Sequence, residues 1–201
     1  MVKIAILGYG TVGSGVFEVV RRNRNAITNK IGEEIEVKYV LDLKTFEDDP
    51  VMEVLTSNYD DIINDDEVKI VCETMGGVKP AYEFTKRALE SGKSVCTSNK
   101  ELVEKHGPKL LKIAKANNCS YLFEASVGGG IPIIRPLRTS LAQEEILSIT
   151  GILNGTTNYI LTKMRDEGLD FDTVLADAQA KGYAERNPEA DVEGYDAGRK
   201  I

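Results

Sequence analysis

The feature that most constrains this chain is a strand, a glycine-rich turn and a helix in that order, close to its first residue. Nearly all residues from Val2 to Leu7 are apolar, which is typical of a strand buried on both faces. Apolar residues recur at helical spacing after the turn, and the turn itself has G-x-G-x-x-G spacing, at Gly8, Gly10 and Gly13. This context predicts a dinucleotide-binding loop.

Each part of the loop has a physical role in such a site. Gly8 allows a tight turn, Gly10 lets a pyrophosphate approach the backbone, and Gly13 lets the helix pack close to the strand. The helix N-terminus offers N–H groups and a positive dipole end to phosphates. The predicted cofactor contacts here are Gly8, Gly10, Thr11, Val12 and Gly13. The alternative is a glycine-rich turn without a ligand.

The composition excludes several classes of protein. The chain has 201 residues and a formal net charge of −7, without a cluster of Lys and Arg, which argues against nucleic acid as a partner. No apolar run reaches the ~18 residues of a membrane span, and the first residues lack the layout of a signal peptide. We therefore expect a soluble, cytoplasmic protein that is large enough to bury an ordinary core.

Strand and helix patterns alternate after the glycine loop, which predicts a Rossmann-type, doubly wound parallel sheet in an α/β fold. Further strands are expected at Glu36–Leu41, Lys69–Glu73, Lys93–Cys96 and Tyr121–Phe123. The polar segment Thr45–Asp61 is predicted to be a surface loop, and the helix that ends near Asn117 is expected to be interrupted at Gly107 and Pro108.

Polar residues follow several of these strands at the edge where such sheets bind ligands. Asp42 suits the adenosine ribose of NAD, whereas Lys44 suits the 2′-phosphate of NADP, so the cofactor preference stays open. The other predicted ligand-facing residues at this edge are Thr74, Ser98 and Lys100.

A glycine-rich segment that begins at Glu124 and ends at Pro132 predicts a domain boundary, with a first domain at 1–123 and a second at 124–201. The second domain is expected to be the start of an α+β domain, with a strand at Ile146–Leu153 and helices after the polar turn 154–157.

Lys200 lies four residues after Asp196, so the two side chains share one helix face. Spacing alone favours a solvated ion pair that contributes ~0.3–0.5 kcal/mol. Gly194 and Gly198 favour a close approach to the backbone instead, because both are poor helix formers. His106 has no partner acid at motif spacing, which argues against a His-Asp dehydrogenase.

Taken together, these motifs resemble homoserine dehydrogenase over nearly the whole chain. The shared segments are Gly8–Gly13, Ser98–Lys100, Glu124–Pro132, Gly151–Tyr159, and Gly182–Glu185 through Asp191 and Asp196 to Lys200. The first segment occurs in many folds, whereas the order and spacing of the later ones are specific to this family.

The resemblance implies reversible, NAD(P)-dependent hydride transfer between L-homoserine and L-aspartate 4-semialdehyde, on the route to threonine and methionine. By this resemblance, Lys200 exchanges a proton with the reacting oxygen, Lys100 lies beside substrate and nicotinamide, and Glu185 and Asp196 bind the substrate. A lysine that acts as a base must be partly neutral. We therefore expect Asp196 and Glu185 to face the substrate's amino group and to leave Lys200 to the reacting oxygen.

The resemblance also implies a sodium ion bound by the backbone carbonyls of Glu124, Val127, Gly129 and Ile131, since a hard cation prefers oxygen ligands. Without a cation, this segment would be a flexible linker. Members of the family are longer than this chain, so we expect activity, and a homodimer, in a longer parent protein.

The residues themselves leave two alternative functions to consider. An acylating semialdehyde dehydrogenase needs a cysteine nucleophile, but Cys72, Cys96 and Cys119 lie outside the glycine-rich turns and suit core positions. A regulatory module that binds NAD(P) without chemistry would explain the glycine loop but not Lys100, Glu185, Asp196 and Lys200.

Overall fold

The chain forms two units in the computed structural model, which describes residues 1–201: Met1–Ile131 and Pro132–Ile201. The predicted boundary at Glu124 and this division differ by the segment 124–131, which groups with the first unit.

A six-stranded sheet forms the centre of the first unit, with the strand order β3-β2-β1-β4-β5-β6 and every neighbouring pair parallel. This order confirms the predicted doubly wound fold. The strands are β1 (Val2–Leu7), β2 (Ile35–Leu41), β3 (Leu55–Thr56), β4 (Val68–Glu73), β5 (Ser94–Thr97) and β6 (Tyr121–Leu122).

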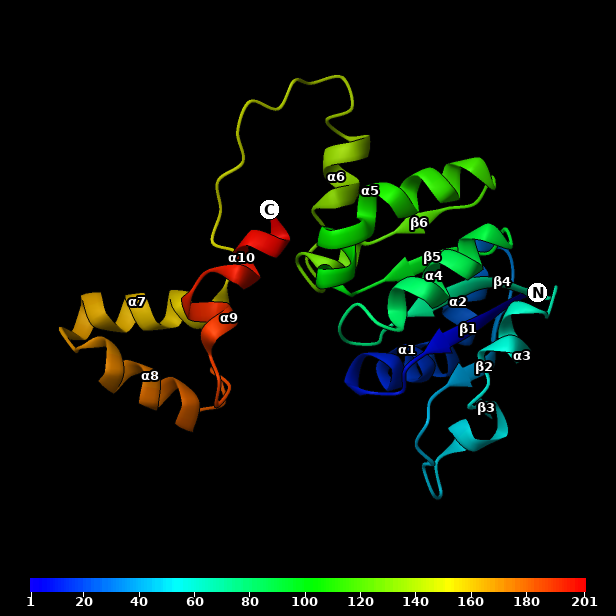
Figure 1. Cartoon of the computed structure of the whole chain (residues 1–201), viewed down its shortest axis with the longest axis horizontal. Helices are drawn as coiled ribbons and strands as arrows, with labels where there is room; N and C mark the ends of the chain where they lie inside the picture. The colour runs from blue at the N-terminus through cyan, green and yellow to red at the C-terminus, as the bar shows by residue number, and fades with distance from the viewer. The chain divides into compact units, whose positions relative to one another are not determined.

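Helices cover both faces of the sheet (Figure 1). The helical segments are α1 (Thr11–Arg22), α2 (Arg24–Ile31), the 3₁₀ helix η1 (Pro50–Glu53), α3 (Tyr59–Ile63), α4 (Ala81–Glu90), α5 (Lys100–Ala116) and the 3₁₀ helix η2 (Glu124–Ser126). Side chains alternate along β1, so Ala5 and Leu7 pack with α3, α4 and α5, while Ile4 and Ile6 pack with α1 and η1. Burial on both faces explains the continuous apolar run of β1.

Two predictions for the first unit are wrong. The segment Thr45–Asp61 is more than a surface loop, because it contains η1, the short strand β3 and the start of α3, with Val51 fully buried. Helix α5 continues through Gly107 and Pro108 without interruption. Burial of Leu102, Leu110 and Ala114 along one face of α5 outweighs the lost N–H of the proline.

The second unit is helical in this chain: α6 (Ile134–Thr139), α7 (Gly155–Glu167), α8 (Phe171–Ala180), α9 (Glu189–Val192) and α10 (Tyr195–Lys200). The predicted strand Ile146–Leu153 does not form, and the segment before α7 runs as an extended loop (Figure 1). A strand needs a hydrogen-bonding neighbour, and no strand of this chain pairs with it. No helix of either unit has the length and apolar character needed to cross a membrane.

Candidate functional site

The glycine loop after β1 is held by hydrogen bonds to the ends of both neighbouring strands. The N–H of Gly8 donates to the Leu41 carbonyl at 2.8 Å, and the hydroxyl of Thr74 lies 3.0 Å from the Gly8 carbonyl. Gly8 has a φ of +92°, which favours glycine. A Cβ on Gly13 would lie 1.9 Å from the Gly8 carbonyl oxygen, so only glycine fits there.

Gly10 differs from these two glycines because open space surrounds it. A Cβ at Gly10 would meet no atom within 4 Å. Helix α1 begins directly after it without a side-chain cap, and Thr11 and Val12 in its first turn are exposed. The loop therefore leaves room and N–H donors for a phosphate group.

Asp42, which follows β2, is fixed beside this loop. Its two carboxylate oxygens accept the N–H groups of Tyr9 at 2.8 Å and Lys44 at 3.0 Å. Burial opposes ionisation, but the N–H groups of Lys44, Tyr9 and Leu43 together hold the pKa of the Asp42 carboxyl below its ordinary value. An ionised carboxylate is thus ready to accept hydrogen bonds at the end of β2.

The remaining predicted residues of this edge follow β4 and β5. The Thr74 hydroxyl also lies 2.9 Å from the Leu7 carbonyl, so this side chain braces the glycine loop. Ser98 is half-buried, and its N–H donates to the Glu73 carbonyl at 3.4 Å. Lys100 is half-buried and begins α5, which Asn99 caps. The sheet therefore gathers Gly8–Gly13, Asp42, Thr74, Ser98 and Lys100 at its carboxyl edge.

The second unit contains a polar cluster around Lys200. The Lys200 ammonium lies 2.6 Å from the Asp196 carboxylate and donates to the Leu153 carbonyl at 2.7 Å. The Asn154 amide donates to Asp196 at 2.8 Å and to Asp191 at 2.7 Å. Its side-chain oxygen accepts the N–H of Thr157 and so caps α7.

Burial separates this ion pair from an ordinary surface pair. The side chain of Asp196 is 7% exposed and that of Lys200 is 19% exposed. The solvated pair that spacing alone favours is therefore wrong. The expectation that Asp196 faces the substrate's amino group and leaves Lys200 to the reacting oxygen stays a prediction; in the structure the Asp196 carboxylate contacts the Lys200 ammonium directly.

Asn154 and Asp191 belong to this cluster, but the sequence analysis did not assign either residue to the site. Their contacts join residues 37 and 42 positions apart, which local spacing does not reveal. The available signal was the position of Asn154, a good helix cap between an apolar run and a helix. Glu185 is exposed, and its backbone carbonyl accepts the Gln179 amide at 3.1 Å.

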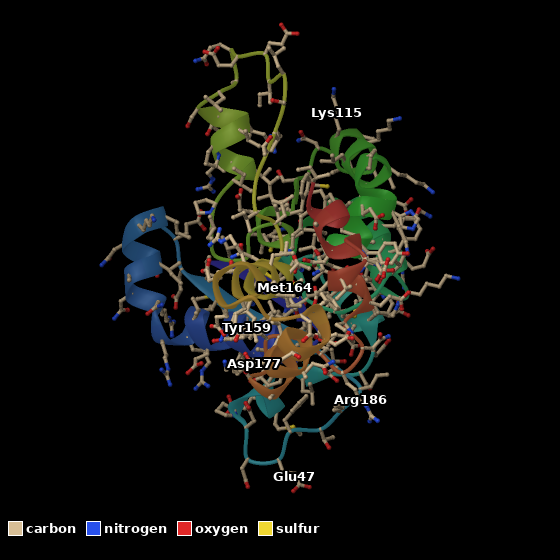
Figure 2. The ribbon with its side chains drawn as sticks, turned by 90° about the vertical axis from the view of Figure 1, so that its left-hand side faces the viewer. Glu47, Lys115, Tyr159, Met164, Asp177 and Arg186 are labelled. Atoms are coloured by element: carbon tan, nitrogen blue, oxygen red, sulfur yellow. The ribbon has the colours of Figure 1, made fainter.

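Helices α7 and α8 support this cluster as a pair. The Tyr159 hydroxyl of α7 donates to the Asp177 carboxylate of α8, and Figure 2 shows the two labelled side chains close to each other. The Thr156 hydroxyl donates to the Tyr183 carbonyl at 2.7 Å. The Thr156 bond ties the start of α7, next to its cap Asn154, to the loop that carries Glu185.

The segment Glu124–Ile131 forms a tight turn. A Cβ on Gly128 would lie 2.5 Å from the Ile131 carbonyl oxygen, and Gly129 has a φ of +59°. The N–H of Ile131 donates to the Gly128 carbonyl at 3.0 Å. No group of three or more His, Cys, Asp and Glu side chains could hold a metal ion, so a cation here would need backbone oxygens.

The cysteines and the histidine take packing positions. The Cys96 Sγ lies 3.4 Å from the Cys72 Sγ across β4 and β5, and this contact together with burial raises the pKa of the Cys72 thiol. Burial raises the pKa of Cys119. The His106 ring packs on Tyr82 with centroids 4.1 Å apart.

Family models match both units of the chain. The model described as "Homoserine dehydrogenase, NAD binding domain" matches residues 8–124, and the model described as "Homoserine dehydrogenase" matches residues 132–201. The chain belongs to the homoserine dehydrogenase family. This result confirms the resemblance seen in the sequence, and the two alternatives, a regulatory module and an acylating semialdehyde dehydrogenase, are not favoured.

Curated homoserine dehydrogenases match the whole chain. The Bacillus subtilis protein is 44% identical over 203 residues, and the Synechocystis protein is 46% identical over 204 residues. Each match covers 100% of this chain but only 47% and 46% of the relative. The chain therefore spans about half the length of these homoserine dehydrogenases.

Solved homoserine dehydrogenases share the fold. The enzyme from Thiobacillus denitrificans superposes with a TM-score of 0.91 at 43% identity, covering 99% of this chain and 47% of that one. A hyperthermophilic archaeal homoserine dehydrogenase in complex with NADPH superposes with a TM-score of 0.85 at 30% identity, covering 99% and 67%.

Proposed function

We propose that this chain forms the cofactor-binding domain (1–123) and the first part of the catalytic domain (124–201) of a homoserine dehydrogenase. The parent protein would interconvert L-homoserine and L-aspartate 4-semialdehyde with NAD(P). The pair of half-buried Lys200 and buried Asp196 carries this proposal, because it places a proton-exchanging group beside a carboxylate that suits a substrate ammonium.

The cofactor site of the proposal lies at the carboxyl edge of the sheet. Bound NAD(P) supplies the hydride acceptor. We assign its pyrophosphate to the loop of Gly8, Gly10, Thr11, Val12 and Gly13, and its adenosine ribose to Asp42. We assign the nicotinamide end of the cofactor to Thr74, Ser98 and Lys100. The open space at Gly10 and the two bonds that orient Asp42 support this assignment.

The substrate site of the proposal uses the cluster in the second unit. We assign Asp196 and Glu185 to the substrate's ammonium, Lys200 to the proton of its hydroxyl, and Lys100 to a position beside the substrate. A substrate ammonium would compete with Lys200 for Asp196. Sharing the Asp196 carboxylate with the substrate would let the Lys200 side chain turn toward the reacting hydroxyl.

We also propose that the carbonyls of Glu124, Val127, Gly129 and Ile131 hold a sodium ion in the parent enzyme. The tight approach at Gly128 and the positive φ of Gly129 support a turn whose oxygens converge. We expect sodium to raise activity of the parent. Activity that is indifferent to sodium and potassium would contradict this part of the proposal.

The assay for the main proposal is homoserine-dependent formation of NADH and NADPH by the full-length parent. We also assign the parent to the cytoplasm, to threonine and methionine biosynthesis and to a homodimeric state, on the family resemblance. No reduction of either cofactor with homoserine would overturn the activity.

The Lys200→Ala variant of the parent tests the proton transfer. We expect kcat to fall ~10²–10⁴-fold with little change in KM, because an acid–base group is lost. Lys163→Ala is the matched control, since Lys163 forms an i,i+4 pair with Glu167 on the surface. Glu185→Ala should mainly raise KM for homoserine. If Lys200→Ala kept its kcat while Lys100→Ala lost it, the two lysine roles would be exchanged.

A further inference from the structure

Glu73, the last residue of β4, is a charged residue type at a fully buried position. Its side chain is 0% exposed. The groups around its carboxyl are the Thr97 hydroxyl at 2.5 Å, the Met75 N–H at 2.8 Å and the amide of Asn99. None of these donors is a cation. Burial raises the pKa of Glu73 above the ordinary value for glutamate, although all three donors oppose the shift.

A buried carboxyl without a cationic partner is costly, and an apolar residue would pack at this place without that cost. A buried carboxyl at position 73 therefore indicates a role other than packing. Glu73 lies at the carboxyl edge of the sheet, where β4 ends, and its donors come from the last residue of β5 and from the segments that follow β4 and β5. Its bonds thus shape two neighbouring loops at the ligand-facing edge.

The first loop follows β4. One Glu73 oxygen accepts the Met75 N–H, which turns the chain directly after the strand. The Met75 side chain packs on the glycine loop, because a Cβ on Gly8 would lie 3.1 Å from the Met75 Cγ. The Asn99 amide donates to the carbonyls of Gly77 at 2.6 Å and Met75 at 3.2 Å, and so ties this loop to the next one.

The second loop follows β5 and leads into α5. The other Glu73 oxygen accepts the Thr97 hydroxyl, and the Thr97 oxygen in turn accepts the Asn99 N–H at 2.9 Å. The Asn99 side chain caps α5 by accepting the Leu102 N–H at 3.1 Å. The chain of bonds from Glu73 therefore ends at the turn that carries Ser98 and Lys100.

The sheet order shows which half of a dinucleotide this network would serve. Asp42 ends β2, the glycine loop follows the neighbouring strand β1, and β4 lies on the other side of β1. A dinucleotide with its ribose at Asp42 and its pyrophosphate at Gly10 extends over the ends of β4 and β5. Its nicotinamide would then meet the two loops that Glu73 shapes.

We propose that Glu73 is a positioning residue for the nicotinamide half of the cofactor, acting through Thr97, Met75 and Asn99 without touching the cofactor itself. The inference rests on the proposed cofactor site. It predicts that loss of the network weakens binding of the nicotinamide half and leaves binding of the adenosine half unchanged.

The test compares two probes on the 201-residue chain: the reduced cofactor that the wild type binds more tightly, and the matching ADP-ribose or 2′-phospho-ADP-ribose, which lacks nicotinamide. Glu73→Gln keeps an acceptor for the Met75 N–H. It places an NH₂ donor opposite the Thr97 hydroxyl, which is itself the donor in the present bond. We expect its Kd for the reduced cofactor to rise about tenfold and its Kd for the fragment to stay within about twofold. The fluorescence change of the bound nicotinamide should shrink in parallel.

Thr97→Val removes the hydroxyl that donates to Glu73 and accepts the Asn99 N–H, without changing the carboxyl, so it provides a second test if Glu73→Gln does not fold. We expect the same split between the two probes. Glu67→Gln is the matched control, because Glu67 is an exposed glutamate at the opposite end of β4, and it should leave both Kd values unchanged.

Equal weakening of both probes in Glu73→Gln and Thr97→Val would show a general structural role and overturn the inference, as would unchanged affinity for both. If the wild-type chain bound the fragment and the reduced cofactor with equal affinity, the inference would be contradicted, while the adenosine site would stand. A wild-type chain that binds neither probe would overturn the proposed cofactor site, and the inference with it.

Discussion

The three glycines of the loop after β1 differ in what a side chain would meet, and this difference separates binding from folding. A Cβ at Gly13 would overlap the Gly8 carbonyl, whereas a Cβ at Gly10 would extend into open space. The backbone of Gly10 is extended, with a φ of −81°, which other residues adopt readily. Substitution at Gly10 therefore addresses the space for a ligand rather than the fold.

We expect Gly10→Val to raise the Kd for NADH or NADPH by tenfold or more, because the new side chain occupies the space of the pyrophosphate. Its melting temperature should fall only slightly, since the helix loses only the cap preference of glycine over valine, at most ~1 kcal/mol. Gly13→Val is the contrasting variant and should destabilise the chain strongly. Isothermal titration calorimetry and thermal melts would measure both quantities. Unchanged affinity in Gly10→Val would place the cofactor elsewhere.

Asp42 is the residue that would set the preference between NAD and NADP. Its charge repels a 2′-phosphate, and Lys44 lies close by in the chain to attract one, so we expect use of both cofactors. Asp42→Asn keeps the shape of the side chain but removes its charge. It should improve the affinity for NADPH relative to the affinity for NADH by about tenfold, ~1.4 kcal/mol. Asp42→Ala also loses the acceptors for Tyr9 and Lys44, so it should weaken NADH further. Equal changes for both cofactors would show that Asp42 does not face the ribose.

Two helices of the second unit begin with similar caps but in different surroundings. Asn154 caps α7 and also donates to Asp191 and Asp196, whereas Asp170 caps α8 at an exposed position by accepting the N–H and the hydroxyl of Thr173. Comparison of the two positions separates the contribution of a cap from the contribution of the acidic cluster.

We expect Asp170→Ala to lower the free energy of unfolding by ~1 kcal/mol, the usual contribution of a cap. Asn154→Ala should cost this amount and ~1–3 kcal/mol more, because partly buried carboxylates lose a donor. In the parent enzyme, Asn154→Ala should also raise KM for homoserine, while Asp170→Ala should not. Urea unfolding and steady-state kinetics measure the two effects. Equal stability losses would show that the amide contributes only a cap.

The elements that the sequence predicts well are those whose burial leaves a local pattern. Strands β1, β2 and β4 consist mostly of apolar residues because helices cover both faces of the sheet, so their predicted bounds lie within a residue or two of the structure. The glycine loop is equally local, because its spacing reflects turn geometry within six residues. The positions of Asp42 after β2, and of Ser98 and Lys100 after β5, follow from the predicted ends of those strands.

The elements that the sequence does not predict depend on distant partners. Strand β3 has two residues and exists only because it pairs with the end of β2. The apolar segment Ile146–Leu153 has the composition of a strand but lacks a neighbour in this chain, so it stays extended with Leu147 87% exposed. The contacts of Glu73 and Asn154 likewise join segments that are far apart in the sequence.

The two units of the molecule differ in the size of their cores. The first unit buries one cluster of 15 residues and another of 8 on the two faces of its sheet. The second unit buries a cluster of only 4 residues, Ile160, Val174, Ala178 and Ala184. Because burial of apolar area is the main favourable contribution to folding, we expect the second unit to unfold at a lower urea concentration than the first.

Cofactor binding should act on one of these transitions only. All residues that we assign to NAD(P) lie in the first unit, and a ligand that binds the folded state at 100 times its Kd adds ~2.7 kcal/mol to the free energy of unfolding. We expect saturating NADPH or NADH to move the transition of residues 1–131 to higher urea and to leave that of residues 132–201 in place, as followed by hydrogen exchange in each segment. Gly10→Val should abolish the shift. Equal protection of both segments would show that the two units unfold as one, and the absence of any shift would contradict the cofactor site.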